Sequence, residues 1–240
     1  LHQTAHNKNN KKNGSIVRYY ENGIQEHEWN YKDDVLDGFE ISYYESGKVK
    51  TRIYYKDGKL QGEGLSFYES GKIMEKGYYK DDFFDGQYTM YYENGKPQEI
   101  YNYIAGKLNG EYKLYYENGN LISEINLVNE KIGELTKSYP EGIVKAYYPN
   151  GALKSKIEFK KGLANGIYET YYENGNIEYE ENYKDDKLDG LLKKYYENGQ
   201  LSIEENYKDG ELDGLIKEYY ENGNIDEEVN YKNNKMNGEA

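Results

Sequence analysis

Apolar and polar side chains alternate along short stretches of this chain. Ile177, Tyr179 and Tyr183 fall on one side of such a stretch, while Glu178 and Glu180 fall on the other. A period of two residues is typical of a β-strand with one apolar face. The stretches are short and end at glycine, so the pattern predicts many short strands and no long helix.

The same pattern recurs every 24 residues, which indicates a tandem repeat. One glycine of each unit follows a Tyr-Tyr pair or its equivalent, and a second lies nine residues earlier, so each unit divides into a nine-residue half and a fifteen-residue half. The first set is Gly23, Gly47, Gly71, Gly95, Gly119, Gly151, Gly175, Gly199 and Gly223, and the second is Gly14, Gly38, Gly62, Gly86, Gly110, Gly166, Gly190 and Gly214.

Each half is expected to form one strand and one turn. The short half, for example residues 214–220, is followed by Asn-Gly, the dipeptide favoured in a type I′ hairpin turn. The long half is followed by a looser turn, for example residues 183–190, whose Leu188 is expected to fold back onto the sheet. The predicted fold is all-β: an elongated single-sheet antiparallel meander, built as an array of β-hairpins with a period of 24 residues and about nineteen strands in all.

The domain prediction has two parts. Residues 1–12 are polar and are expected to be a disordered leader, whereas residues 13–240 form one continuous array, irregular at 133–151. There the next turn after Gly119 comes 23 residues later, at Gly142, and the turn at Gly151 follows after only nine. This spacing suggests that a fifteen-residue half has been lost, with a kink or local repacking near Pro140 and Pro149.

The composition of the chain disfavours several classes of function. The chain has 31 basic and 44 acidic residues, a formal charge of −13, and such a surface disfavours nucleic acid and anionic lipid. No apolar run approaches the roughly 18 residues of a membrane-spanning helix, so no integral membrane segment is expected. The 32 tyrosines supply buried ring area while their hydroxyls stay in water, which suits a thin sheet.

The sequence lacks the combinations of residues that usually form an active site. There is no cysteine, and His27 is the one histidine within the array, so no nucleophile and base can be paired. The carboxylates recur with the repeat, as they would on a solvated surface. We therefore expect no catalytic, cofactor-binding or metal-binding residues and no enzyme. A hydrolase would need two buried, convergent carboxylates, and stacked turns at Asp185 and Asp209 would need to share a hard cation to form a metal site.

The repeat unit, for example residues 195–201 continued through 207–214, resembles the MORN repeat in its bacterial variant form. The resemblance extends over about residues 13–240. It implies a protein-binding array, because similar repeats occur in an antitoxin family of toxin–antitoxin systems and in surface-associated arrays. It implies no catalytic residues, and the degenerate copy between Gly133 and Gly142 departs from the pattern.

The adjacent tyrosines of each unit point to opposite faces of a strand, so a single-layer sheet leaves one of each pair accessible. Tyrosine is enriched at protein interfaces. The partner-binding residues predicted on this basis are Tyr91, Tyr115, Tyr147, Tyr171, Tyr195 and Tyr219.

The expected function is that of a non-enzymatic scaffold for a protein partner, either as an antitoxin or as a surface interaction protein. The negative charge favours a basic partner. The alternative is a cell-surface module that holds glycan or choline groups between tyrosine rings. An edge strand near Ala240 could also pair end to end with a second copy. The compartment stays open, with an exported or surface-associated bacterial location favoured over the cytoplasm.

Overall fold

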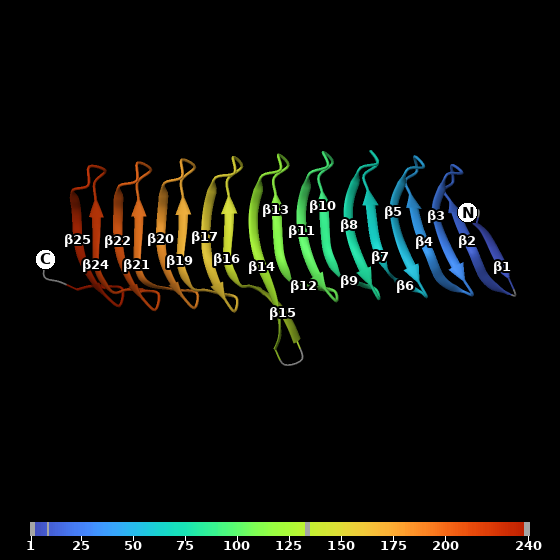
Figure 1. Cartoon of the computed structure of the whole chain (residues 1–240). Coiled ribbons are helices and arrows are strands. Elements are labelled where there is room, and N and C mark those ends of the chain that lie inside the picture. Colours follow the sequence, from blue (N-terminus) through green and yellow to red (C-terminus); the bar gives the residue numbers. More distant parts are fainter. Residues whose placement is uncertain (1–2, 9, 133–134, 238–240) are drawn as a thin grey trace. The chain divides into compact units, whose positions relative to one another are not determined.

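The computed structural model describes residues 3–8, 10–132 and 135–237, and it describes side chains over residues 10–128 and 139–237. The chain divides into a first unit, residues 1–119, and a second unit, residues 120–240. Both units consist of antiparallel strands, and their described residues form no helix. The predicted all-β meander of hairpins is therefore confirmed (Figure 1).

The strands of the first unit are β1 (Gln3–Lys8), β2 (Lys11–Tyr19), β3 (Gln25–Lys32), β4 (Val35–Tyr43), β5 (Val49–Lys56), β6 (Lys59–Leu60), β7 (Gly62–Phe67), β8 (Ile73–Lys80), β9 (Phe83–Phe84), β10 (Gly86–Tyr91), β11 (Pro97–Ile104), β12 (Lys107–Leu108) and β13 (Gly110–Tyr115). Those of the second unit are β14 (Leu121–Ile132), β15 (Leu135–Pro140), β16 (Gly142–Tyr147), β17 (Leu153–Lys160), β18 (Leu163–Ala164), β19 (Gly166–Tyr171), β20 (Ile177–Lys184), β21 (Lys187–Tyr195), β22 (Leu201–Lys208), β23 (Glu211–Leu212), β24 (Gly214–Tyr219), β25 (Ile225–Lys232) and β26 (Lys235–Met236).

One repeat consists of a long strand, a tight turn, a two-residue strand and a six-residue strand, as in β22, β23 and β24. The two-residue strands raise the count above the nineteen expected. Leu212 pairs with Tyr207 in the ladder, and Leu188 pairs in the same way with Tyr183. The region expected to be a looser turn with a leucine folded back is thus a continuation of the sheet.

The turn at Asn-Gly is not of type I′, contrary to the prediction. Of Glu197, Asn198 and Gly199, Gly199 alone has a positive φ, +87°. The Gly199 N–H donates to the Tyr196 carbonyl at 2.8 Å, and the Asn198 side chain accepts a hydrogen bond from the Gln200 N–H at 2.9 Å. A type I′ turn would need positive φ at both central residues. The asparagine therefore stabilises the turn through its side-chain oxygen, and the glycine stabilises it by adopting a positive φ.

The turns with two left-handed residues lie at the opposite end of the strands. Asp185 and Asp186 have φ of +50° and +66°. The Asp186 carboxylate accepts a hydrogen bond from the Ala164 N–H at 2.6 Å, and the Asp186 N–H donates to the Ala164 carbonyl at 3.1 Å. Ala164 belongs to the preceding repeat, so this turn joins two repeats. Where glycine replaces the second aspartate, as at Gly210, its N–H still donates to the preceding repeat, to Leu188 O at 2.8 Å.

A second connection between repeats comes from the tyrosine that directly follows each short strand. The Tyr172 hydroxyl donates a hydrogen bond to the backbone carbonyl of Tyr195, 23 residues later, at 2.8 Å. Equivalent bonds of 2.6 to 2.8 Å recur through both units, and we call this series the tyrosine ladder. Its donors are Tyr20, Tyr44, Tyr68, Tyr92, Tyr148, Tyr172 and Tyr196, and its acceptors are the carbonyls of Tyr43, Phe67, Tyr91, Tyr115, Tyr171, Tyr195 and Tyr219.

The expected disordered leader is largely strand. Residues 3–8 form β1, which pairs antiparallel with β2 from Gln3 opposite Arg18 to Lys8 opposite Lys11. The edge of β2 offers unpaired backbone groups, and a polar segment can satisfy them without an apolar face. Residues 1, 2 and 9 lie outside the described residues.

The irregular segment is an insertion and not the loss of a half. Gly119 and Gly151 are separated by 32 residues, which is 32 − 24 = 8 more than one repeat. The extra residues lengthen β14 and β15 into a hairpin that extends beyond the other turns of the second unit (Figure 1). Ser123 still pairs with Ala146 across β14 and β16, so the register of the sheet is kept. Residues 133–134 lie outside the described part of the chain.

The sheet has almost no central core. Among the described side chains, the buried apolar residues are Ile16, Leu65, Ala164 and Leu192. Most other rings and aliphatic groups are half-buried against neighbouring strands. Stability must therefore come from contacts between adjacent repeats. The described residues include no helix long and apolar enough to cross a membrane.

Replacing Gly199 by Val should destabilise the protein by about 1 to 3 kcal/mol, because a β-branched side chain at φ +87° is strained. Thermal or urea unfolding measures this effect. Glu197→Ala, in the same turn but exposed, is the control and should unfold like the parent. If the Gly199 variant also unfolds like the parent, the turn assignment is wrong.

Replacing Tyr172 by Phe removes one bond of the tyrosine ladder and leaves the Tyr195 carbonyl without this donor. The expected cost is about 0.5 to 1.5 kcal/mol in the free energy of unfolding. Tyr168→Phe, in the strand that directly precedes Tyr172, is the matched control, since no hydrogen bond of its hydroxyl is found in the described structure. Equal stability of the two variants would show that the ladder adds nothing.

Candidate binding face of the second unit

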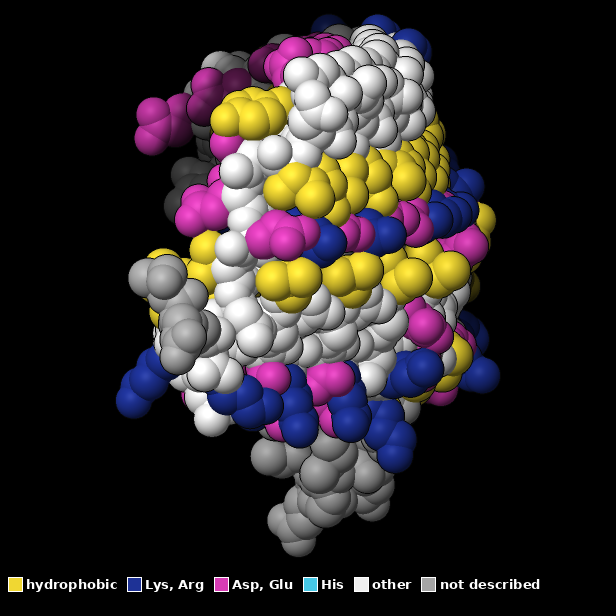
Figure 2. All heavy atoms as spheres, turned by 90° about the vertical axis from the view of Figure 1, so that its left-hand side faces the viewer, with side chains coloured by type: hydrophobic (Ala, Val, Ile, Leu, Met, Phe, Trp, Pro, Cys, Tyr) yellow, Lys and Arg dark blue, Asp and Glu magenta, His cyan; other side chains and the backbone are white. Residues whose placement is uncertain are grey.

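One face of the second unit carries three parallel rows of side chains, and we call it the banded face. The rows follow from the register, because residues paired across antiparallel strands share a face. Glu180 pairs with Lys193, Lys193 with Glu204, and Tyr195 with Leu201, so these residues point the same way. Figure 2 shows two rows of hydrophobic side chains separated by a row of acidic and basic ones.

The middle row is a continuous line of directly paired charged residues. Like charges meet twice in this line, at Lys145 with Lys156 and at Glu169 with Glu180. Neighbours of opposite charge offset the repulsion, because Lys156 also contacts Glu169 at 2.6 Å. In strand order the charged row is Glu124, Lys145, Lys156, Glu169, Glu180, Lys193, Glu204, Lys217 and Glu228.

These contacts shift the pKa values of the row. Hydrogen bonding to Glu124 raises the pKa of Lys145, and hydrogen bonding to Glu169 raises that of Lys156. Burial acts to raise the pKa of Glu169, but hydrogen bonds from Lys156 and Tyr171 outweigh it and lower that pKa. Lys145, Lys156 and Glu169 therefore stay charged at neutral pH, and opposite charges along the row largely neutralise one another.

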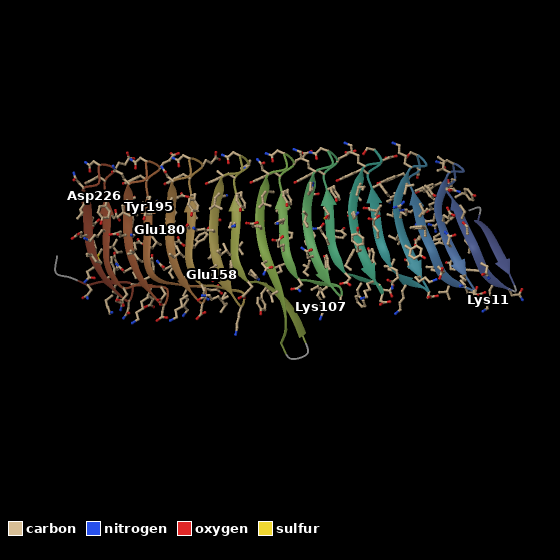
Figure 3. The ribbon with its side chains drawn as sticks, viewed as in Figure 1. Lys11, Lys107, Glu158, Glu180, Tyr195 and Asp226 are labelled. Carbon is tan, nitrogen blue, oxygen red and sulfur yellow. The ribbon has the colours of Figure 1, made fainter. Side chains whose placement is uncertain are left out.

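The tyrosine row lies on one side of the charged row and is bound to it. The Tyr195 hydroxyl donates to the Glu180 carboxylate at 2.6 Å, and Figure 3 shows these two residues together. Tyr219 donates to Glu204 at 3.0 Å in the same way. Burial, followed by the hydrogen bond to Glu180, raises the pKa of Tyr195 above its usual range. The row consists of Tyr147, Tyr171, Tyr195 and Tyr219, opposite Leu153, Ile177, Leu201 and Ile225.

The structure thus gathers four of the six predicted partner-binding tyrosines in one row of the second unit. Tyr91 and Tyr115 occupy the same repeat position in the first unit. All six are half-buried, and their role in binding a partner stays a prediction.

The aliphatic row, on the other side of the charged row, was missed by the sequence reasoning. Ile143, Ile167 and Leu215 are 57%, 49% and 38% exposed, and Leu191 is half-buried between them. A shallow depression of about 370 Å³ lies beside Ile143 and Ile167 and reaches Glu158. The signal was present: each residue directly follows the second glycine of its repeat, at a spacing of 24 residues.

The described residues contain no cluster of three or more histidine, aspartate or glutamate side chains that could hold a metal ion. The stacked aspartates of the turns bond to neighbouring backbone and side-chain groups, as Asp185 does to Asn165 at 3.1 Å. His27 stacks on Trp29, with ring centroids 4.9 Å apart.

Comparison with known proteins identifies the family of the repeat. A family model described as MORN repeat variant matches residues 36–57, 60–81, 84–105, 108–129, 140–161, 164–185, 188–209 and 212–233. The search of curated proteins found no match. A crystal structure of TcdB2-TccC3 is 12% identical, with a TM-score of 0.20 over 94% of this chain, and one of TcdB2-TccC3-Cdc42 is 12% identical, with a TM-score of 0.18 over 95%. This chain spans 14% and 16% of the length of those chains, and scores this low support no conclusion.

The raised tyrosine pKa values predict alkaline unfolding. Burial, followed by Glu205, raises the pKa of Tyr207 from 10.0 to about 12, and the unfolded phenol titrates near 10. The folded state binds the phenolic proton more tightly, so this stability is complete below pH 10 and is lost as the pH rises towards about 12. Urea unfolding at increasing pH, followed with tyrosinate absorbance, measures it. Stability that stays constant across that range would contradict the assignment, and Tyr207→Phe should reduce the loss.

Proposed function

The chain belongs to the MORN repeat variant family, and from that premise we propose that it is a non-enzymatic scaffold whose banded face binds a basic protein partner. The observation that carries the proposal is the exposed aliphatic row of Ile143, Ile167 and Leu215. Exposed apolar side chains arranged in a continuous line are typical of a protein interaction surface. The half-buried tyrosine row and the neutralised charged row beside it provide the polar contacts of such a surface.

Charge supports a basic partner. The second unit contains 25 of the 44 acidic residues and 15 of the 31 basic ones, a balance of 15 − 25 = −10 within the total of −13. A potential of this sign attracts a basic protein and raises its association rate at low salt. The charged row contains nearly equal numbers of acidic and basic residues, so it adds little net charge. The acidic residues around it therefore attract the basic partner, and the three rows of the banded face make contact with it.

The finer role is a hypothesis taken from the family resemblance. An antitoxin that sequesters a basic toxin fits the charge, and so does a bacterial surface protein with a basic binding partner. End-to-end pairing through an edge strand also stays a prediction. The glycan- or choline-binding alternative has less support, because tyrosine hydroxyls of the banded face already bond to glutamates such as Glu180.

A photo-crosslinking amino acid at position 167, in extract of the source organism, tests the proposal. We expect crosslinks to proteins of high isoelectric point. The matched control is the same amino acid at position 104, since Ile104 is 59% exposed but belongs to the first unit and not to the banded face. Crosslinks only to acidic proteins, or equal products at both positions, would contradict the proposal.

With the purified partner, Ile167→Asp combined with Leu215→Asp should weaken binding about tenfold or more, a change of about 1.4 kcal/mol. Ile104→Asp should leave the affinity unchanged. Both substituted residues are exposed, so thermal unfolding should match the parent. Unchanged affinity of the double variant, or retention on glycan or choline resin in place of a protein, would contradict the proposal.

A further inference from the structure

Two glycines face each other in the middle of the first unit, on a surface separate from the banded face. Gly64 of β7 pairs directly with Gly77 of β8. Both have φ outside the left-handed region, so backbone conformation does not require glycine at either position. The equivalent positions in seven other repeats carry side chains: Ile16 with Trp29, Glu40 with Ile53, Tyr88 with Tyr101, Val144 with Ile157, Tyr168 with Glu181, Leu192 with Glu205, and Ile216 with Val229.

Aromatic rings from this strand and the next ones occupy the space that side chains at the two glycine positions would fill. A Cβ added at Gly64 would lie 2.7 Å from Tyr79, and one added at Gly77 would lie 2.7 Å from Tyr88 and 2.9 Å from Phe84. A hollow of about 160 Å³ remains, and its walls include these rings. The hollow lies beside the rings, so a flat group could lie against them.

A buried hydroxyl without a partner lies in the same hollow. Ser66, two residues from Gly64 and on the same face, is 8% exposed, and its Oγ has no hydrogen-bond partner among the described residues. Leaving a buried hydroxyl unpaired costs about 1 to 3 kcal/mol. Ser66 lines the hollow but its hydroxyl is covered by neighbouring atoms, so a ligand that bonds to it must displace one of the lining side chains.

An acidic side chain without a basic partner completes the lining. Glu75 pairs with Ser66 across the strands and lines the same hollow as Tyr88. Burial, followed by the charge of Glu75, raises the pKa of Tyr88. Within the described part of the chain, no basic side chain lies at ion-pair distance from Glu75. The nearby Lys76 instead contacts Glu63 at 2.6 Å.

We propose that this hollow binds a guanidinium group. A guanidinium is planar and stacks on tyrosine and phenylalanine rings, and its N–H groups can donate to Ser66 Oγ and to the Glu75 carboxylate. A trimethylammonium group has no N–H, so it would leave Ser66 unpaired. The guanidinium comes either from a free small molecule or from an arginine side chain of a protein. The proposal does not depend on the banded face.

Amide NMR titration of the full chain tests it, with the Gly64 and Gly77 signals as reporters. The probes are methylguanidinium chloride, a Gly-Arg-Gly peptide with blocked ends, the same peptide with citrulline, and tetramethylammonium chloride. We expect guanidinium probes to shift both glycine signals, and citrulline and tetramethylammonium to bind about tenfold more weakly or not at all. Binding of the peptide alone assigns the arginine side chain as source, and binding of methylguanidinium alone assigns a free molecule. Equal binding of arginine and citrulline, or no shift with either guanidinium probe, would overturn the proposal.

Variants locate the site. Ser66→Ala and Glu75→Gln should each weaken guanidinium binding about tenfold. The matched control is Glu99→Gln, because Glu99 stands 24 residues after Glu75 in a repeat whose two glycine positions are filled by Tyr88 and Tyr101. Thermal unfolding checks that each variant is folded. If Glu99→Gln weakens guanidinium binding as much as Glu75→Gln does, the site is not at Glu75. If Glu75→Gln does not fold, the comparison of guanidinium, citrulline and tetramethylammonium probes on the parent protein decides whether the hollow binds a guanidinium group.

Discussion

Each repeat of this protein is too flat to bury its own apolar surface, so it depends on bonds to the repeat beside it. The tyrosine ladder is the clearest of these bonds: a phenol hydroxyl reaches the backbone carbonyl of a residue 23 positions later. At the other end of the strands, the aspartate or glycine turn hydrogen-bonds to the preceding repeat. Because both connections use the backbone of the neighbour, they place few demands on the side chains that cover the two faces.

That division explains how a regular array can carry distinct surfaces. On the second unit, aliphatic, charged and tyrosine rows lie side by side, since residues 24 apart in the sequence are brought into line. On the first unit, Gly64 and Gly77 let aromatic rings pack over the strands beside a hollow, while the ladder continues through Tyr44 and Tyr68. Function in such a protein can change by substitution on a face, while the repeat itself stays intact.

The period and the strand pattern were predictable from the sequence because they depend on local alternation and on glycine spacing. The turn types were not, because Asn-Gly is compatible with two geometries, and the bond from Asn198 to Gln200 selects the one with a single left-handed residue. The insertion before Gly142 was misjudged because glycine spacing alone cannot distinguish a lost half from a lengthened hairpin. The leader was misjudged because β2 offers an edge that a polar strand can pair with.

The candidate surfaces were only partly predictable. The tyrosine positions could be read from the Tyr-Tyr pairs, but which neighbours they bind depends on the register, as with Tyr195 and Glu180. The unpaired hydroxyl of Ser66 could not be foreseen at all, because it depends on what surrounds the side chain in three dimensions.

Unfolding of a truncation series tests the central claim most directly. Chains ending after Lys184, Lys208 and Lys232 retain successive numbers of repeats in the second unit. Nearest-neighbour coupling predicts that all three fold, and that the free energy of unfolding rises by a similar step with each repeat added. Loss of all folded structure on removing the last two repeats would show that stability resides in a distributed core, and would contradict the account.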